Sequence, residues 1–449
     1  MGHSNHVAGT QGQHSVDFQL QQFWLPFTPN KEFQREPRLI ERAEGMYFFA
    51  PGGRRVIDAS AGLFCVAAGH CRPEIAEAVY RQMQTLDFAP TFLRGHPGAF
   101  ELANRIVEHT PPGMNRVFFV NSGSESVDTA MKIALMVHRV RGQSQRQIFI
   151  SRERAYHGVN MGGVALGGML NNRRAYGIGL ATVYHMRHTW LAANRFVKGQ
   201  PESGAELAED LARFCQLYGG ENIAAVFVEP TAGAFGCLPP PKGYLDRLRE
   251  ICDANGILLV FDEVICGWGR MGAHFGAQAF GVTPDMITMA KALTNGAQPM
   301  GAVAVRQQIY DAINEAGPER GIEFFHGYTY SAHPVACAAG LAMMEIYKKD
   351  RLVERARELS AYFADAIHSL RDLPVVQDIR SVGMLAAIEV VAAGGVPAVR
   401  GHEAQKRLFD RGLHLKNTGD SLIIAPPLIA EKQHIDEIVE KLRDVLCGL

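Results

Sequence analysis

The chain has 449 residues and a mass of 49.3 kDa, which is long enough for about two or three domains. Hydrophobic residues make up 47% and charged residues 20% of the sequence, which is typical of a folded globular protein and argues against a disordered one. Lys and Arg total 45 and Asp and Glu total 46, giving a net charge of -1, so nucleic acids and anionic membranes are not expected partners.

The first fifteen residues are polar, and we expect them to be disordered. They contain no secretory signal pattern, and no run in the chain reaches the roughly 18 apolar residues of a membrane span. The eight cysteines lack CxxC and zinc-finger spacing, which favours reduced thiols and a cytoplasmic location. His3, His6 and His14 offer possible metal ligands, but a frayed terminus is the preferred interpretation and no metal site is expected.

The next segment predicts an arm and a hairpin. Residues 24–33 mix aromatic residues with prolines, which favours an extended arm of the kind that often crosses a dimer interface. Residues 45–62 predict two short strands around the Pro51-Gly52-Gly53 turn. We assign residues 16–73 to this arm and to part of a small domain.

From about residue 74, helical patterns alternate with short apolar runs, which predicts a large α/β domain over 74–330 with a mostly parallel sheet. The helix expected at 243–254 presents Leu245, Leu248 and Ile251 on one face. The candidate strands are 116–120, 147–151, 223–229, 257–262 and 286–289.

Residues 331–449 predict the C-terminal part of the small domain. Helices are expected at 334–348 and 351–370, a strand at 384–391 and a last helix from about residue 430. We expect this second lobe to be shared with the N-terminal segment.

The turn after the strand at 116–120 predicts an anion site. There the strand leads into the small polar residues Ser122, Gly123 and Ser124 and then into a helix. Free backbone amides and the positive end of the helix dipole would point to one spot, where a phosphate fits. The alternative is that Ser124 or Ser126 is only an N-cap.

Two charged residues stand at the ends of predicted buried strands. Asp262 ends the apolar run 257–261, where α/β proteins place ligands, although a helix cap or a buried ion pair would also explain it. Lys291 follows the strand at 286–289, and most lysines are simply solvated. A lysine among apolar residues can instead act as an amine nucleophile toward an aldehyde.

Aromatic residues complete a possible cofactor site. Tyr156 and His157 follow the second predicted strand, and residues 325–334 gather aromatics around Thr329. Each cluster alone is consistent with ordinary turn packing. Together, the phosphate turn, the aromatic platform, Asp262 and Lys291 supply the contacts that pyridoxal phosphate requires.

The chain also resembles a known family in several segments that span nearly its whole length. These segments are NSGSES (121–126), YHG (156–158), VEP (228–230), FDEVICGWGR (261–270), MAKALTNG (289–296) and GYTYSAHPVACAAGLA (327–342), and they resemble the class III pyridoxal-phosphate aminotransferases. The opening WLPFTPN, the AGHCRPEI block and the TGDSLIIAPPLI ending are similar to the omega-amino acid:pyruvate (beta-alanine:pyruvate) branch. The resemblance implies a fold-type I α/β architecture, with a seven-stranded sheet in the large domain and a smaller α+β domain built from both termini. It also implies a homodimer with shared active sites, or a tetramer.

The resemblance implies a role for each matching residue. Lys291 would bond to the cofactor aldehyde and later carry a proton, and Asp262 would pair with the pyridine nitrogen. Ser122, Gly123 and Ser124 would hold the phosphate, with Thr329 arriving from the other subunit. The ring would lie between Tyr156 and Val264, with His157 nearby and Glu229 and Glu263 in support. The substrate pocket would include Trp24, Phe64, Phe92, Tyr156 and Lys416.

Three positions depart from the patterns of related branches. Lys416 stands where the omega branch is expected to have a carboxylate-binding arginine, and a lysine lacks the planar two-pronged fit. A solvated Lys416 is the alternative, with Arg94 or Arg174 as other candidates for the carboxylate. Phe64 replaces an expected tryptophan, which implies a larger pocket. Ala234 occupies the position of a second glutamate in the ornithine and 4-aminobutyrate branches, which favours pyruvate as the acceptor.

These inferences predict a metal-free aminotransferase that moves an amino group from a beta-alanine-like omega-amino acid or a primary amine to pyruvate. Three alternatives stay open: another class III enzyme, such as an aminomutase, decarboxylase or epimerase; an amine:pyruvate transaminase that needs no donor carboxylate; and a non-catalytic, cofactor-binding relative.

Overall fold

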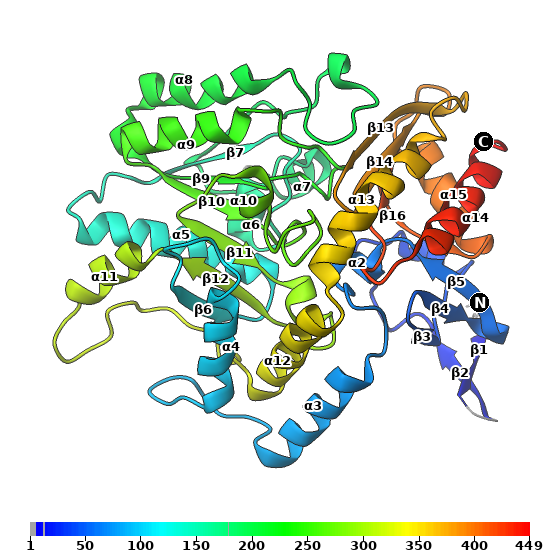
Figure 1. Cartoon of the computed structure of the whole chain (residues 1–449), viewed down its shortest axis with the longest axis horizontal. Coiled ribbons are helices and arrows are strands. Elements are labelled where there is room, and N and C mark those ends of the chain that lie inside the picture. Colours follow the sequence, from blue (N-terminus) through cyan, green and yellow to red (C-terminus); the bar gives the residue numbers. More distant parts are fainter. Residues whose placement is uncertain (1–5, 12–13, 178) are drawn as a thin grey trace.

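A seven-stranded sheet forms the centre of the larger lobe in the computed structural model, which describes residues 6–11, 14–177 and 179–449 (Figure 1). The strand order is β6-β12-β11-β10-β9-β7-β8, and only β12 runs antiparallel to its neighbours within this sheet. The strands are β6 (Arg116–Val120), β7 (Ile148–Arg152), β8 (Val183–Met186), β9 (Ile223–Val228), β10 (Leu258–Asp262), β11 (Met286–Met289) and β12 (Gly301–Val305).

The five strands predicted for the large domain are confirmed, and two more, β8 and β12, were not predicted. The alanines of β12 have low strand propensity, which hides this strand in the sequence. Close packing explains its small residues, because a Cβ added to Gly301 would lie 2.6 Å from the carbonyl oxygen of Ser122. The mostly parallel sheet predicted from the sequence is therefore present, with one antiparallel strand inside it.

Helices cover both faces of this sheet, as the alternation of buried side chains requires. Leu258 and Val260 of β10 belong to the core beneath α5 (Gly123–Val140) and α11 (Gln307–Glu315). Leu259 and Phe261 point to the other core, which α4 (Pro97–Val107) and α9 (Tyr244–Asn255) enter. The predicted face of α9 is confirmed, because Leu245, Leu248 and Ile251 are all buried in that core. Each such side chain contributes about 1.5–3 kcal/mol by leaving water.

The smaller lobe contains two four-stranded sheets. One has the order β13-β14-β17-β16, with β13 (Val376–Val382), β14 (Leu385–Val390), β16 (Lys416–Thr418) and β17 (Ser421–Ile424). The other has the order β15-β5-β4-β3, with β3 (Arg42–Glu44), β4 (Tyr47–Ala50), β5 (Arg54–Asp58) and β15 (Leu413–His414). Because β15 pairs with β5, segments from both the N-terminal and the C-terminal part of the chain share one sheet.

The predicted helices of the C-terminal part are confirmed as α12 (Pro334–Lys349), α13 (Leu352–His368) and α15 (Lys432–Leu446), and the predicted strand is β14. The hairpin at 45–62 is confirmed as β4 and β5. The remaining helices are α2 (Ala61–Phe64), α3 (Pro73–Thr85), α6 (Met161–Leu166), α7 (Leu170–Tyr176), α8 (Glu209–Tyr218), α10 (Gly276–Phe280) and α14 (Val399–Asp410). In the described ranges, no helix combines the length and the apolar character needed to cross a bilayer.

The N-terminal region differs from the expectation in two places. The arm at 24–33 contains one helical turn, α1 (Asn30–Phe33), because the Asn30 side chain bonds to both the amide and the carbonyl of Leu25. Residues 6–11 and 14–19 form the antiparallel pair β1 (His6–Gln11) and β2 (His14–Gln19), where disorder was expected over 1–15. Alternating polar and apolar residues in the second segment are compatible with a strand. His3 lies outside the described residues.

A buried ion pair joins α9 to the start of β11. Asp285, directly before β11, accepts hydrogen bonds from the Arg249 guanidinium and the Leu259 amide, each at 2.8 Å. Only 7% of the Asp285 side chain is exposed, whereas Asp253, the second partner of Arg249, is 67% exposed.

We expect Asp285→Ala to lower the free energy of unfolding by about 3 kcal/mol, because it leaves the buried Leu259 amide without this acceptor and leaves Arg249 with its exposed partner Asp253. Asp253→Ala is the matched control at the same arginine and should lose at most about 1 kcal/mol. Urea denaturation of the two variants checks this, and equal losses would contradict it.

Candidate active site

A cavity of about 110 Å³ lies where the carboxyl ends of β10 and β11 meet the start of α5. This is the edge at which open α/β sheets place ligands. Eight of the predicted site residues line the cavity: Gly123, Ser124, Tyr156, His157, Glu229, Asp262, Val264 and Lys291.

The start of α5 opens toward this cavity. Its N-cap is Ser122, whose Oγ accepts from the Glu125 amide at 3.2 Å, so the alternative of Ser124 or Ser126 as the cap is wrong. Ser124 Oγ instead accepts from the Val159 amide at 3.0 Å, which fixes the loop on the other side of the cavity. A Cβ on Gly123 would come within 3.1 Å of both Val264 methyl carbons, so only glycine leaves this space open. The positive end of an 18-residue helix therefore faces the cavity and suits an anion.

The Asp262 carboxylate is held by three hydrogen-bonding groups. One oxygen accepts from the Val264 amide at 3.2 Å and from the Thr288 hydroxyl at 3.0 Å. The other lies 2.8 Å from His157 Nδ1, and Ser151 Oγ lies 3.0 Å from Nε2 of the same ring. The carboxylate is thus buried, oriented and available to a partner in the cavity.

Sequence reasoning missed Thr288 and Ser151. Thr288 is the β11 residue in register with Asp262, so it becomes visible as a partner only when the strands are paired. Ser151 is the next-to-last residue of β7 and acts through His157. A polar residue near the carboxyl end of a buried strand was the available signal in both cases.

Lys291 begins the short 3-10 turn η5 (Lys291–Thr294) and lines the cavity. Its backbone has φ of +49°, a left-handed conformation that costs a residue with a Cβ of order 1–3 kcal/mol. Such a conformation persists only where the surroundings impose it. The fold therefore holds this amine in place rather than leaving it on a free loop.

Glu229 supports the loop that carries Tyr156. Its two carboxylate oxygens accept from the Tyr156 amide at 3.0 Å and from the Gly233 amide at 3.1 Å. Burial raises the pKa of both Glu229 and Tyr156. Gly158 has φ of +101°, and a Cβ there would lie 2.5 Å from Ser124 Oγ, so this glycine permits the close approach of the loop to α5.

The other predicted residues do not line this cavity in the single chain. Trp24 is 88% and Phe92 is 58% exposed, and Thr329 is exposed as well. Phe64 is buried and packs in one cluster with Ile265, which does line the cavity. Lys416, at the start of β16, donates its backbone amide to Ser60 Oγ at 2.8 Å, and burial lowers the pKa of its side chain.

Glu263 lies beside the site without lining the cavity. Its two carboxylate oxygens accept from the amides of Gly276 and Ala277, both at 2.7 Å, at the start of α10. Burial raises the pKa of this carboxyl group to about 7, and the two backbone amides oppose that shift.

Comparison with known proteins identifies relatives along almost the whole chain. Residues 29–446 match the sequence profile of the family described as aminotransferase class-III. An omega-aminotransferase of Caulobacter vibrioides is 54% identical over 428 residues, which are 95% of this chain and 97% of that protein. A beta-alanine--pyruvate aminotransferase of Pseudomonas aeruginosa is 46% identical over 437 residues, which are 97% of each protein.

Solved structures agree with this likeness. An omega transaminase from Pseudomonas jessenii in complex with PMP aligns with a TM-score of 0.90 at 32% identity, covering 96% of each chain. An (S)-enantioselective omega-transaminase from Thermomicrobium roseum aligns with the same TM-score at 34% identity, covering 96% of this chain and 97% of that chain. The fold-type I architecture expected from the sequence is thereby confirmed.

The geometry of Glu263 predicts a pH dependence of stability. Its pKa is about 7 in the folded chain against 4.5 for a solvated glutamate, so between these values the folded chain binds the extra proton. Stability from this group therefore falls as the pH rises from about 4.5 to about 7. We expect the melting temperature of Glu263→Gln, relative to the unmodified protein, to rise across this range.

Thermal melts at a series of pH values check this expectation. The control is Glu221→Gln, since Glu221 is an exposed glutamate and the difference for Glu263→Gln is compared with it. A difference for Glu263→Gln that does not change with pH would contradict the effect of burial.

Proposed function

The chain belongs to the class III aminotransferases, and from this premise we propose that it uses pyridoxal phosphate to move an amino group from an omega-amino acid or a primary amine to pyruvate. The names of two relatives, beta-alanine--pyruvate and omega-amino acid--pyruvate aminotransferase, support this choice of donor and acceptor.

One observation carries the proposal: an amine, a carboxylate and a helix N-terminus line one cavity. The cofactor has an aldehyde, a pyridine nitrogen and a phosphate, and these match Lys291, Asp262 and the start of α5 in chemistry. Gly123 and Gly158 leave space that a side chain would fill. The residues present therefore fit this cofactor.

When bound, pyridoxal phosphate supplies an electron sink for the carbon that bears the amino group. Asp262, fixed by His157 and Thr288, would keep a proton on the pyridine nitrogen. The Lys291 amine, which lines the cavity, would hold the cofactor through its aldehyde carbon, and its Nζ, when free, would accept and return a proton. Tyr156 and Val264 would confine the ring, and Glu229 would hold the Tyr156 loop in place.

Lys416 is proposed as the group that meets the donor carboxylate. It stands on β16, and the Thr418 hydroxyl of the same strand donates to the Ala234 carbonyl at 2.7 Å, which joins this strand to the loop after β9. Phe64 would widen the substrate pocket. Trp24 and Phe92 are exposed and do not line the cavity of the single chain, so they would line the substrate pocket only beyond that cavity.

A second candidate is an amine:pyruvate transaminase with no need for a donor carboxylate. The observation that favours it is the lowered pKa of Lys416, which burial causes. Over the described part of the chain, no carboxylate forms an ion pair with this lysine. Burial disfavours the charged form of Lys416, which weakens its pairing with the carboxylate of an omega-amino acid.

We also propose a homodimer in which Thr329 completes the phosphate site of the partner subunit. Thr329 is exposed and is not among the residues that line the cavity of its own chain. Exposed apolar side chains lie near it in the sequence, at Phe325 and Tyr330, and others lie in the segment 88–93, at Phe88, Phe92 and Leu93. Such exposed apolar side chains are expected of a surface that another chain covers. A tetramer and a cytoplasmic location stay predictions.

The half-reaction tests the proposed function. Adding beta-alanine or 1-phenylethylamine without a keto acid to the cofactor-loaded protein should abolish its visible absorption band and leave PMP, and pyruvate should restore the band. Lys291→Ala should lower turnover by at least about 10³-fold, because it removes the only amine that lines the cavity among the described residues. A band that returns without a keto acid would favour a decarboxylase or epimerase, and Lys291→Ala with full turnover would contradict the assignment.

The role of Lys416 has its own test. Lys416→Ala should raise the KM for beta-alanine about tenfold, the loss expected for one charge-assisted hydrogen bond, and leave 1-phenylethylamine unchanged. Lys416→Arg is the matched control and should retain or improve beta-alanine kinetics. Equal kinetics of Lys416→Ala for both donors would favour the second candidate.

A further inference from the structure

The turn that presents Lys291 is strained at both ends. Lys291 has φ of +49° and Asn295 has φ of +55°, and between them lies the single turn η5. Asparagine tolerates this conformation better than most residues, but lysine does not share that preference. Contacts from outside the turn must therefore hold it.

Asn295 supplies two such contacts from one side chain. It is 6% exposed, its Oδ1 accepts from the Ala68 amide at 2.8 Å, and its Nδ2 donates to the Gly69 carbonyl at 2.9 Å. The amide therefore bridges two successive residues of a segment more than 220 positions away in the chain. The Tyr347 hydroxyl adds a weaker bond, at 3.3 Å, to the carbonyl of Ala292.

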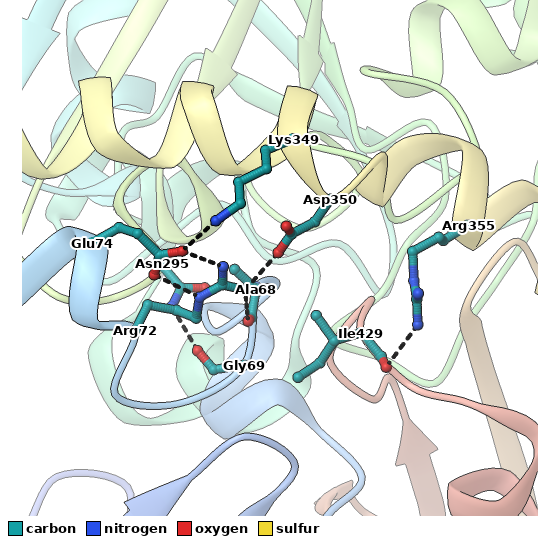
Figure 2. A network of polar contacts seen from close by, with 9 residues as sticks. All are labelled: Ala68, Gly69, Arg72, Glu74, Asn295, Lys349, Asp350, Arg355 and Ile429. Atoms are coloured by element: carbon teal, nitrogen blue, oxygen red, sulfur yellow. Dashed lines mark hydrogen bonds and ion pairs between the residues drawn. The ribbon is translucent and has the colours of Figure 1, made fainter.

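The segment to which Asn295 bonds, at Ala68 and Gly69, is itself held by further hydrogen bonds. Figure 2 shows the Arg72 side chain reaching the Ala68 carbonyl and the Asp350 carboxylate, at 3.2 and 2.7 Å. Glu74 accepts from the same arginine at 2.9 Å and from Lys349, at the end of α12, at 3.3 Å. The residues around Asn295 thus form one connected polar network (Figure 2).

The same segment also continues the wall that holds Phe64. Phe64 ends α2, four residues before Ala68, and belongs to the same buried cluster as Ile265, which lines the cavity. A Cβ on Gly296 would lie 3.0 Å from that of Cys65, so the backbone after the Lys291 turn runs directly against this wall. The two sides of the site meet through the Asn295 amide.

We propose that Asn295 is a positioning residue: its amide locks the Lys291 turn to the 61–69 segment, so that the amine and the Phe64 wall keep one relative placement. This inference rests on the role of Lys291 proposed above. Asn295 touches neither substrate nor cofactor in this account and acts through the backbone of the turn. Loss of the clamp releases the turn without removing the amine.

Two variants separate the clamp from the backbone conformation. Asn295→Gly keeps the left-handed φ accessible but removes both hydrogen bonds. Asn295→Asp keeps the shape and the acceptor for Ala68 but places an oxygen against the Gly69 carbonyl. Asn255→Ala is the matched control, because the Asn255 side chain also bonds to a backbone carbonyl, that of Ile251, at the end of α9 away from the cavity.

For both Asn295 variants of the loaded enzyme we expect kcat to fall about tenfold, with a KM for the amine donor within about threefold of the unmodified value, as for a displaced reacting group. The pH midpoint of the visible absorption band should shift, and in the cofactor-free protein hydrogen exchange should rise at 291–296 and 61–69 together. The control, Asn255→Ala, should change neither the kinetic constants and the pH midpoint nor the hydrogen exchange of these two segments.

These measurements distinguish a failure of the proposed function from a failure of the positioning role of Asn295. No Lys291-dependent band in the unmodified protein would overturn the proposed function itself. A normal band with unchanged kcat and pH midpoint in both Asn295 variants would overturn the positioning role alone, as would faster exchange confined to 291–296.

Discussion

The hydrogen bonds on the Asp262 carboxylate are the constraint on which the site depends. They join three separate strands: Asp262 ends β10, Thr288 lies on β11, and Ser151 on β7 reaches the carboxylate through His157. Burial destabilises a carboxylate that lacks such partners, so the group would then favour its protonated form or a hydrogen bond to water. The parallel register of the sheet therefore determines which groups hold this carboxylate at the cavity.

Close backbone approach is the second constraint, and it explains why glycine occupies specific positions. Gly123 faces Val264, and Gly158 faces Ser124, so the two walls of the cavity come together at points where a Cβ would be crowded at Gly123 and would clash at Gly158. This leaves the positive end of α5 open to an anion while the Ser122 cap accepts a hydrogen bond from the Glu125 amide in the first turn of the helix. The same arrangement brings the Tyr156 loop against the helix, held from behind by Glu229.

Distant parts of the chain cooperate in holding the reactive lysine. The strained turn at 291–295 meets the N-terminal segment through Asn295 and the α12 helix through Tyr347. The sheet shared by β5 and β15 places the C-terminal segment beside that same N-terminal segment. Because Ala59 accepts from Ala425 and Ala67 accepts from Leu428 through their backbones, the small lobe is joined to the wall of the site at two points.

The sequence by itself determined the alternation of strands and helices, the strand-end positions of Asp262 and Lys291, and the glycine-containing turn before α5. These features are local, since side-chain period and turn residues are set within a few positions. Ser122 as the cap, Thr288 and Ser151 as partners of the acidic site, and the partners of Asn295 were decided by the tertiary structure. They depend on strand register and on contacts between residues far apart in the chain, which no local pattern records. β12 was missed for the same reason. It begins with Gly301, which packs closely against Ser122 at the start of α5, and its small residues have low strand propensity.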